Sequence, residues 1–488
     1  MTKSVRFLFA VTGGALAYAA VHLNLTVLPG PAIGLGLLVG VVVALVAQGL
    51  PGVAASGLAV LLGFIVDSLG ADPVRSGWDL LLGAPLAMIT TYVASRFLAR
   101  QGARGRRALA ALGLAICLAA MIGSTVVSVS TPMEDGRTTV QMLADIPQPG
   151  TYATDEALYL RTSVLMHDGA GYYTAVEDAF AGLDTPVTSP GGAINRRLPT
   201  LFWLWGAMPG SSGASLVALA LLAGTLATAS AWQFARRCAG PAAGVVAAAL
   251  TAMFYAEIAS TTRALHTEPY AAACALAAMA LFAAAYDPRT VHRMRWLWAA
   301  AAMALLGALF RELQVVVLVG GLAGSIVASR REETRDWMPW AAGLGVFVAA
   351  YLAHVLSVGG SVLSDRSFAY WLGIDMEWAG RVLTYGSTVM AGGSWLPAVL
   401  AIAALAGVFA TRSGSLRIFL LVGVLVPGMA FTLLGPSGWT APGGAAAISS
   451  GGAPAYWGGL IVPPMLVLSA LMPLVGQRVA GDRGGKTG

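Results

Sequence analysis

Charge is scarce in this sequence, and so are histidine, lysine and cysteine. Only 11% of the 488 residues are charged and 5 are histidines, whereas soluble domains carry about 25% charged residues. A soluble domain is therefore excluded. The three cysteines, Cys117, Cys238 and Cys274, fall in or at the ends of apolar runs and have no metal-ligand spacing. We interpret them as small core residues.

Apolar residues make up 57% of the chain, and runs of about eighteen or more of them recur from end to end. Each run is long enough to cross the hydrocarbon core of a bilayer as a helix. The runs are continuous rather than alternating, which excludes an outer-membrane barrel. We therefore predict an all-α polytopic integral membrane protein with about 14 transmembrane helices. The expected helices lie near 5–27, 32–50, 53–70, 78–97, 108–130, 213–235, 241–258, 268–286, 296–310, 313–329, 338–358, 392–411, 417–435 and 457–476.

The basic residues sort into alternate loops, as expected for a multi-pass membrane protein. With the N-terminus inside, the inner loops and both termini hold most of the 29 basic residues, and the outer segments are acidic overall. We expect cytoplasmic termini and outer segments that face the periplasm or exterior. Abundant Ala, Gly, Val and Arg with very few Lys is typical of a GC-rich bacterial genome, so the expected location is a bacterial inner (plasma) membrane. The charge bias explains the basic pI without a nucleic-acid partner.

The longest interruption between apolar runs is the outer segment 131–212. Within it, the stretch 154–167 favours a helix, and the stretch 168–197 is expected to be loop-like. The segment 196–208 is too short to span a bilayer, so we interpret it as interfacial or re-entrant. A later outer segment, 359–391, has the composition of an amphipathic helix at the membrane surface.

Four groups of polar residues lie on the predicted outer side, where a charge beside the bilayer is costly and suggests a function. Asp155 and Glu156 follow Thr154, which is typical of a helix start with Thr154 as its N-cap. Two arginines precede "LPTLFW", and their planar, permanent charges suit a phosphate. Three of the groups alone also have a plainer interpretation, namely acids that complement a helix dipole, arginines that anchor at the interface, and an adjacent ion pair at a turn. The four groups are Asp155 and Glu156; Asn195, Arg196 and Arg197; Glu257, Arg263, His266 and Glu268; and Arg311 and Glu312.

Together these groups favour one shared cavity that contains acids and accepts anions. A sugar linked to a lipid through phosphate needs cations to neutralise the leaving phosphate, and an acceptor hydroxyl needs a carboxylate base within hydrogen-bond reach. Cytosolic nucleotide sugars do not reach an outer site, so a lipid carrier embedded in the bilayer would supply the donor.

The order of the groups resembles a known family. The segments "TDEALYLRTSVLMHDGAGYY", "NRRLPTLFWLWGAM" and "TTRALHTEPYAAA" are similar to segments of the polyprenyl-phosphate-sugar-dependent glycosyltransferases of the GT-C superfamily. The nearest groups are the protein O-mannosyltransferases and the bacterial aminoarabinose transferases that act on lipid A. The sequence departs from that pattern in four additional N-terminal spans, in one proline rather than two in the basic segment, and in lacking a large outer domain. We therefore predict three parts, namely extra N-terminal transmembrane helices in 1–106, a GT-C-like catalytic core in 107–358 that includes the outer loop 131–212, and C-terminal helices with an interfacial segment in 359–488.

The resemblance also implies a reaction and roles for its residues. The protein would be an inverting glycosyltransferase that moves sugar from a polyprenyl-phosphate donor to a hydroxyl of an extracytoplasmic lipid, glycan or protein. Asp155 would be the general base, and Glu156 would orient it or help to bind a divalent cation. Metal dependence is left open, with Mg or Mn as the ion and Asp155, Glu156 and Glu268 as candidate ligands. The substrate- and phosphate-binding candidates are Arg196, Arg197, Arg263, His266, Glu268, Arg311, Tyr172 and Tyr173.

Two other functions stay open on the sequence. A transporter or flippase for a lipid-linked or anionic solute would place its charges near the bilayer midplane, on broken helices and often in two related halves. Here the charges gather at the ends of spans instead. A non-catalytic assembly or lipid-binding subunit would modify no acceptor when purified alone.

Overall fold

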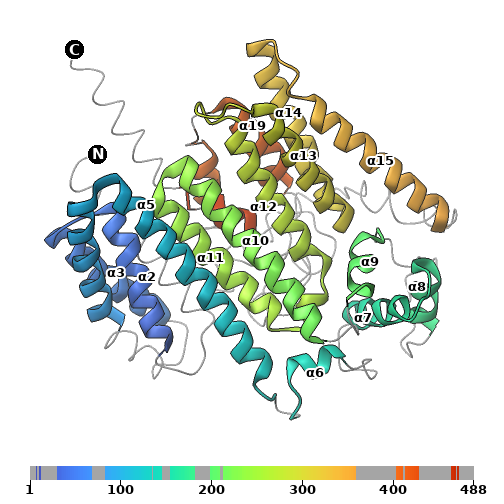
Figure 1. Cartoon of the computed structure of the whole chain (residues 1–488), viewed down its shortest axis with the longest axis horizontal. Coiled ribbons are helices and arrows are strands. Elements are labelled where there is room, and N and C mark those ends of the chain that lie inside the picture. Colours follow the sequence, from blue (N-terminus) through green and yellow to red (C-terminus); the bar gives the residue numbers. More distant parts are fainter. Residues whose placement is uncertain are drawn as a thin grey trace, which may run out of the picture.

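The computed structural model describes a helical protein. The described residues are 7, 10–11, 30–68, 83–133, 136–144, 154–181, 198–208, 213–358, 403–409, 411, 413–427, 463–468 and 470–471. Within these ranges every regular element is a helix, as the sequence predicts. Long helices pack side by side, and the short helices α6 to α9 gather at one edge of the molecule (Figure 1).

The N-terminal helices form one group in which α5 contacts both α2 and α3 (Figure 1). Element α5 comprises two helices, one on each side of a kink, and they match the two spans expected at 78–97 and 108–130. The helix bends at Gly102, whose φ of 53° and ψ of −127° are open mainly to glycine. The three helices are α2 (Gly30–Val46), α3 (Leu50–Ser68) and α5 (Ala84–Ser130).

Six helices make up the central part of the chain, and α12 lies at its centre. Helix α12 contacts α10, α13 and α14, and nearly all of its residues are buried. Its alanine-rich sequence allows this, because small side chains let neighbouring helices approach closely. The polar residues that begin and end α12 are thereby held at opposite ends of the bundle. The six helices are α10 (Gly213–Ala239), α11 (Pro241–Ala259), α12 (Thr267–Ala285), α13 (Arg293–Phe310), α14 (Val315–Glu332) and α15 (Met338–Val358).

The long outer segment carries four short helices. The predicted helix at 154–167 is confirmed as α7, but the expectation of a loop throughout 168–197 was wrong, because α8 lies within that stretch. The glycines favoured a loop in the sequence, yet only Gly169 needs one, with a φ of 101° just after α7. Beyond it, Tyr172, Ala175, Val176 and Ala179 share one buried face at helical spacing. The four helices are α6 (Thr139–Ala144), α7 (Thr154–His167), α8 (Tyr172–Ala181) and α9 (Thr200–Gly206).

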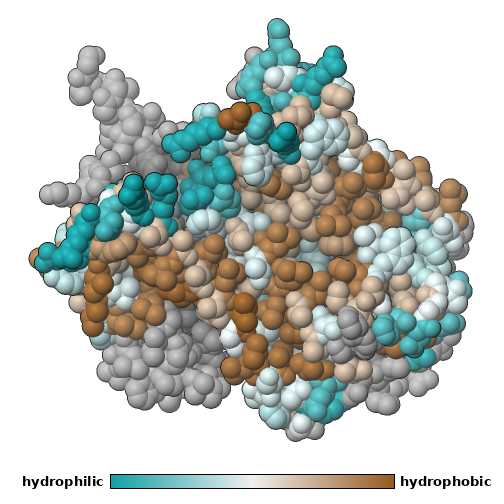
Figure 2. All heavy atoms as spheres, viewed as in Figure 1, coloured by the Kyte–Doolittle hydropathy of each residue, from teal (hydrophilic) through white to brown (hydrophobic). Residues whose placement is uncertain are grey.

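The described helices have the lengths and composition of membrane spans. Six of them are long and apolar enough to cross a bilayer, and Figure 2 shows hydrophobic surface across the middle of the molecule with hydrophilic surface towards its edges. Large apolar side chains such as Leu222 and Leu352 are exposed on these helices, which suits contact with lipid. The total of about 14 spans remains a prediction. The six are Ala84–Ser130, Gly213–Ala239, Pro241–Ala259, Thr267–Ala285, Glu312–Arg330 and Met338–Ser357.

The C-terminal third is described only in pieces. Helix α19 (Gly414–Leu420) continues into the π-helical turn η6 (Leu421–Leu425), and both contact α14. They coincide with the start of the span expected at 417–435. The interfacial helix expected at 359–391 and nearly all of the span expected at 5–27 lie outside the described residues.

Candidate functional site

A buried carboxylate opens helix α12. Glu268 lies in the first turn of the helix and is only 1% exposed. Its Oε2 accepts a hydrogen bond from the Thr267 hydroxyl at 3.2 Å, and its Oε1 lies 3.0 Å from Arg311 Nε in an ion pair. The positive end of the helix dipole also favours an acid at this position. His266, the residue that precedes the helix, is buried beside them.

The partner of Glu268 lies between two other helices. Arg311 follows α13 in extended conformation and leads into the short 3₁₀-helix η4 (Glu312–Gln314). Its guanidinium is buried, and its Nη1 lies 3.7 Å from Glu312 Oε2. Glu312 Oε1 in turn accepts a hydrogen bond from the backbone N–H of Leu198 at 2.9 Å. We call Glu268, Arg311 and Glu312 the Glu268 cluster. It joins the start of α12, the end of α13 and the residue that follows Arg197.

Aromatic side chains connect α7 to this region through α9. Tyr159 on α7 packs edge-on against Phe202, with ring centroids 5.3 Å apart, and also contacts Trp205. Trp205 packs against Tyr270 in the first turns of α12, at 5.9 Å. At the other end of α7, His167 Nδ1 lies 3.0 Å from the carbonyl oxygen of Gly206. Helix α7 also contacts the 3₁₀-helix η3 (Thr262–Leu265), so the segment that carries Asp155 adjoins the segment that carries Arg263.

The two tyrosines of the Gly/aromatic stretch have different surroundings. Tyr172 is buried against Phe202, at 5.3 Å between ring centroids. Tyr173 stacks on His354 at 5.8 Å, and its hydroxyl lies 3.1 Å from His354 Nδ1. His354 is a buried residue near the end of α15 that the sequence analysis did not single out. A lone ionisable residue in an apolar run was the only signal available for it.

The structure thus brings some of the predicted site residues together and leaves others outside the description. Glu268 and Arg311 are in contact and His266 adjoins them. Tyr172 and Tyr173 lie on α8, where Tyr172 packs on Phe202 of α9 and Tyr173 packs on His354. Arg196 and Arg197 precede the described segment that starts at Leu198. The side chains of Asp155, Glu156 and Arg263 also lie outside the description, although their backbone belongs to α7 and η3.

The metal candidates can be tested only in part. Among the residues that the structure describes, no group of three or more His, Cys, Asp and Glu side chains is close enough to hold a metal ion. Glu268, the one candidate ligand with a described side chain, already pairs with Arg311 and Thr267.

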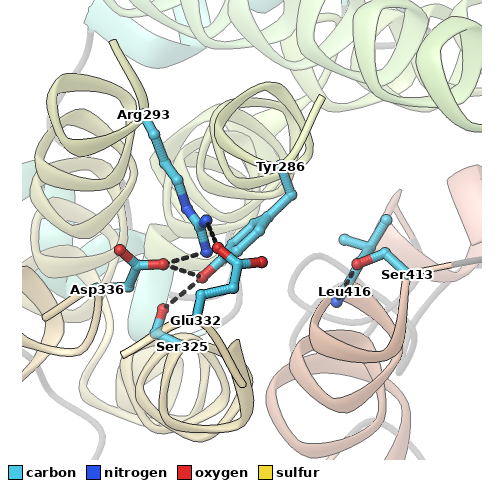
Figure 3. Close-up of polar contacts among 7 residues, drawn as sticks. All are labelled: Tyr286, Arg293, Ser325, Glu332, Asp336, Ser413 and Leu416. Carbon is cyan, nitrogen blue, oxygen red and sulfur yellow. Dashed lines mark hydrogen bonds and ion pairs between the residues drawn. The ribbon is translucent and has the colours of Figure 1, made fainter. Parts of the chain in front are cut away.

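A second charged group lies at the opposite ends of α12 and α13. The Tyr286 hydroxyl donates to Asp336 Oδ2 at 3.2 Å, and Arg293 forms ion pairs with both Asp336 and Glu332 (Figure 3). The Arg293 guanidinium also lies over the Tyr286 ring, 4.2 Å from its centroid. We call Tyr286, Arg293, Glu332 and Asp336 the Asp336 cluster. It fastens the α12–α13 hairpin to the connection between α14 and α15.

Comparison with known proteins identifies the class of this molecule. Residues 198–356, about a third of the chain, match the sequence model of a family described as dolichyl-phosphate-mannose-protein mannosyltransferase. The protein is therefore a multi-pass membrane glycosyltransferase that uses a polyprenyl-phosphate sugar donor. Over these residues the chain is similar to that family, in agreement with the GT-C resemblance. No curated protein and no solved structure matches the chain.

The matched range contains the whole Glu268 cluster. It begins at Leu198, the residue bonded to Glu312, and ends two residues after His354. Helix α7, with Asp155 and Glu156, precedes the matched range.

Proposed function

We propose that this protein transfers a sugar from a polyprenyl-phosphate donor to a hydroxyl group of an extracytoplasmic lipid, glycan or protein, with inversion at the anomeric carbon. The observation that carries the proposal is the buried chain from Glu268 through Arg311 and Glu312 to the Leu198 N–H. It holds Leu198, the residue that follows the predicted phosphate-binding arginines, beside the acidic start of α12. The charge sorting along the chain supports an active site on the outer face of a bacterial plasma membrane.

In this proposal, Arg197 with its neighbour Arg196 binds the donor phosphate. Their support is the fixed position of the next residue, since Leu198 is buried and its N–H is bonded to Glu312. Arginine suits the role because its planar fork pairs with phosphate oxygens and keeps its charge. Neutralising the phosphate where charge develops lowers the barrier to its departure.

Asp155 is the proposed general base. Its carboxylate accepts the proton of the acceptor hydroxyl as the oxygen attacks the anomeric carbon. The bond from that carbon to the phosphate oxygen breaks in the same displacement, and polyprenyl phosphate leaves with the electron pair. The position supports the role, because four residues along α7 lead to Tyr159, which packs on the α9 aromatics that reach Tyr270. Glu156 would orient Asp155 or help to hold a divalent cation.

The second wall of the site is formed by Glu268 with His266 and Arg263. Arg311 was predicted to bind phosphate directly, but its guanidinium is buried and paired with Glu268. We therefore propose that Arg311 positions Glu268 and, through Glu312, the basic segment. Tyr172 and Tyr173 would support the α7 side of the cavity from behind the α9 aromatics.

The test is an assay of purified protein with a panel of polyprenyl-phosphate sugars, which measures released polyprenyl phosphate and sugar on the acceptor. Asp155→Asn should lower turnover by about 10²- to 10⁴-fold, the usual contribution of a general base. Asp168→Asn is the matched control, since Asp168 is an exposed acid just beyond the other end of α7, and it should retain turnover. Adding a chelator, followed by Mg²⁺ or Mn²⁺, decides whether a cation takes part.

Two results would contradict the proposal. Near-normal turnover by folded Asp155→Asn would remove the base assignment. Flux of the lipid-linked sugar across liposomes without any chemical change would favour the transporter instead.

A further inference from the structure

Three arginines lie towards the end of the bundle that is away from the Glu268 cluster. Arg236 and Arg237 form the last turn of α10, and Arg107 lies on α5, which contacts both α10 and α11. Arg237 forms a hydrogen-bonded ion pair with Asp287, which lies just beyond the end of α12. The arginines therefore lie at the end of the bundle where α12 ends. We call Arg107, Arg236 and Arg237 the arginine cluster.

The arginine cluster carries more positive charge than its neighbours balance. Asp287 Oδ2 lies 3.0 Å from Arg237 Nη1. Arg236 Nη2 donates to the neutral amide of Gln233 at 2.7 Å, and within the described residues no carboxylate pairs with Arg236 or Arg107. The Nε atoms of Arg236 and Arg237 are buried and lack hydrogen-bond partners there. Positive charges held together without matching acids attract an anion.

Trp232 adds an interfacial side chain to the same place. The Arg236 guanidinium lies over its ring, 4.4 Å from the centroid, and the Trp232 Nε1–H is buried without an acceptor among the described residues. Helix α11 packs closely against Trp232 and Arg236. A Cβ added at Gly244 of α11 would lie 2.9 Å from Arg236 Cβ and 3.0 Å from the Trp232 carbonyl oxygen. Tryptophan and arginine are characteristic of the headgroup level of a bilayer.

An apolar stripe leads away from the arginine cluster along α10. Leu222 and Leu226 are exposed. Gln233 lies two helical turns after Leu226 and Arg236 one turn further, so all four lie on the same face of α10. Figure 2 shows the corresponding change, with hydrophilic surface where α5 bends and α10 ends, and hydrophobic surface next to it along both helices. A ligand that fits both parts has an anionic head and apolar chains.

We propose that the arginine cluster and Trp232 form a binding site for the headgroup phosphate of an anionic phospholipid, whose acyl chains lie along α10. Guanidinium forks bind the phosphate oxygens, and the Trp232 ring holds the Arg236 guanidinium at the headgroup level. The site is separate from the transferase site, because it adjoins the end of α12 rather than its start. A free phosphate shares the headgroup chemistry but would not use the apolar stripe.

Native mass spectrometry of the detergent-purified full chain tests the proposal. The protein is mixed with equal amounts of phosphatidylglycerol and phosphatidylcholine, and the bound lipids are counted. The unaltered protein should retain phosphatidylglycerol preferentially. Arg107→Gln/Arg236→Gln should lose about thirtyfold in phosphatidylglycerol affinity, since each arginine near a membrane surface contributes about fivefold. The control is Arg295→Gln, an exposed arginine at the same end of the bundle, which should bind as the unaltered protein does.

The remaining outcomes are also decisive. Equal phosphatidylglycerol binding by the double variant and the unaltered protein would overturn the site. Complete displacement of the lipid by excess inorganic phosphate would show a soluble-anion site and overturn the lipid assignment. If the double variant does not fold, the melting temperature of the unaltered protein tests the proposal by itself. Its melting temperature should rise to saturation with phosphatidylglycerol but not with phosphatidylcholine, and identical responses would overturn the proposal.

Discussion

The α12–α13 hairpin has a charged cluster at each end, and the two clusters have similar chemistry. The Asp336 cluster centres on Arg293 at the start of α13, and the Glu268 cluster centres on Arg311 just after its end. In both, one arginine pairs with two carboxylates from different elements. From composition alone, either end of the hairpin qualifies as a functional site.

Their surroundings differ. In the Asp336 cluster, Arg293 is 24% exposed and Glu332 is 53% exposed, and the bonds join the ends of neighbouring helices (Figure 3). In the Glu268 cluster, Glu268 and Arg311 are nearly fully buried, and Glu312 holds a backbone N–H from a distant segment. That segment follows the predicted phosphate-binding arginines. Because similar clusters of charge lie at both ends of the hairpin, a charge beside the bilayer does not by itself indicate a functional site. The clusters differ in what they hold, which is a distant backbone segment in the Glu268 cluster and the ends of neighbouring helices in the Asp336 cluster.

Breaking the Glu268 cluster should have the largest effect. Glu268→Ala leaves Arg311 buried without its closest carboxylate, and breaking a buried ion pair costs about 3–5 kcal/mol of unfolding free energy. We expect a large loss of stability and no measurable transfer. Denaturant unfolding and released polyprenyl phosphate measure the two effects.

Glu268→Gln separates stability from function, because it keeps the size of the side chain. We expect the folded fraction of this variant to transfer sugar at least about tenfold more slowly, the equivalent of one lost hydrogen bond to a charged group. Full turnover per folded molecule would mean that the Glu268 cluster only stabilises the fold, as we expect for the Asp336 cluster.

Breaking the Asp336 cluster should affect stability alone. Asp336 is buried and receives both Arg293 and the Tyr286 hydroxyl. Asp336→Asn keeps the shape but removes the charge, so we expect a loss of about 1–3 kcal/mol in unfolding free energy. Turnover per folded molecule, assayed at a temperature where the variant is folded, should match that of the unaltered protein. A turnover loss as large as that of Glu268→Gln would erase the distinction between the two clusters.

The two clusters also show how much of the fold and of the site could be predicted from the sequence. Long apolar runs fix helices well, so the span expected at 268–286 is found as α12 (Thr267–Ala285). The sequence also singled out Glu268 and Arg311, because a charge in or beside the bilayer is costly. It could not pair them, since Arg311 was interpreted with its neighbour Glu312, and only tertiary packing brings α12 and α13 together. His354 was missed for the same reason, because its contact with Tyr173 depends on how α8 packs against α15.

Loosening the basic segment should have a moderate effect. Glu312→Ala removes the acceptor of the Leu198 N–H, and an unsatisfied buried N–H costs about 1–3 kcal/mol. If this bond positions Arg196 and Arg197, the KM for the donor should rise about tenfold, equivalent to about 1.4 kcal/mol, with a smaller change in kcat. Glu312→Gln retains a carbonyl acceptor and should lie much closer to the unaltered protein. A fall in stability with an unchanged KM in Glu312→Ala would make Glu312 a structural residue only.

The smallest effect is expected on the α8 side, at the contact between Tyr173 and His354. Tyr173→Phe removes the hydroxyl that lies 3.1 Å from His354 Nδ1 but keeps the ring stacked at 5.8 Å. One hydrogen bond contributes about 0.5–1.5 kcal/mol, so we expect a stability loss of that size. The ring contacts of Tyr173 in the described structure are with Tyr172 and His354, so turnover per folded molecule should change far less than in Glu268→Gln. If the hydrogen bond is all that the pair contributes, His354→Phe should lose as much stability as Tyr173→Phe. A turnover loss in Tyr173→Phe as large as that of Glu268→Gln would instead extend the site from the start of α12 to the end of α15.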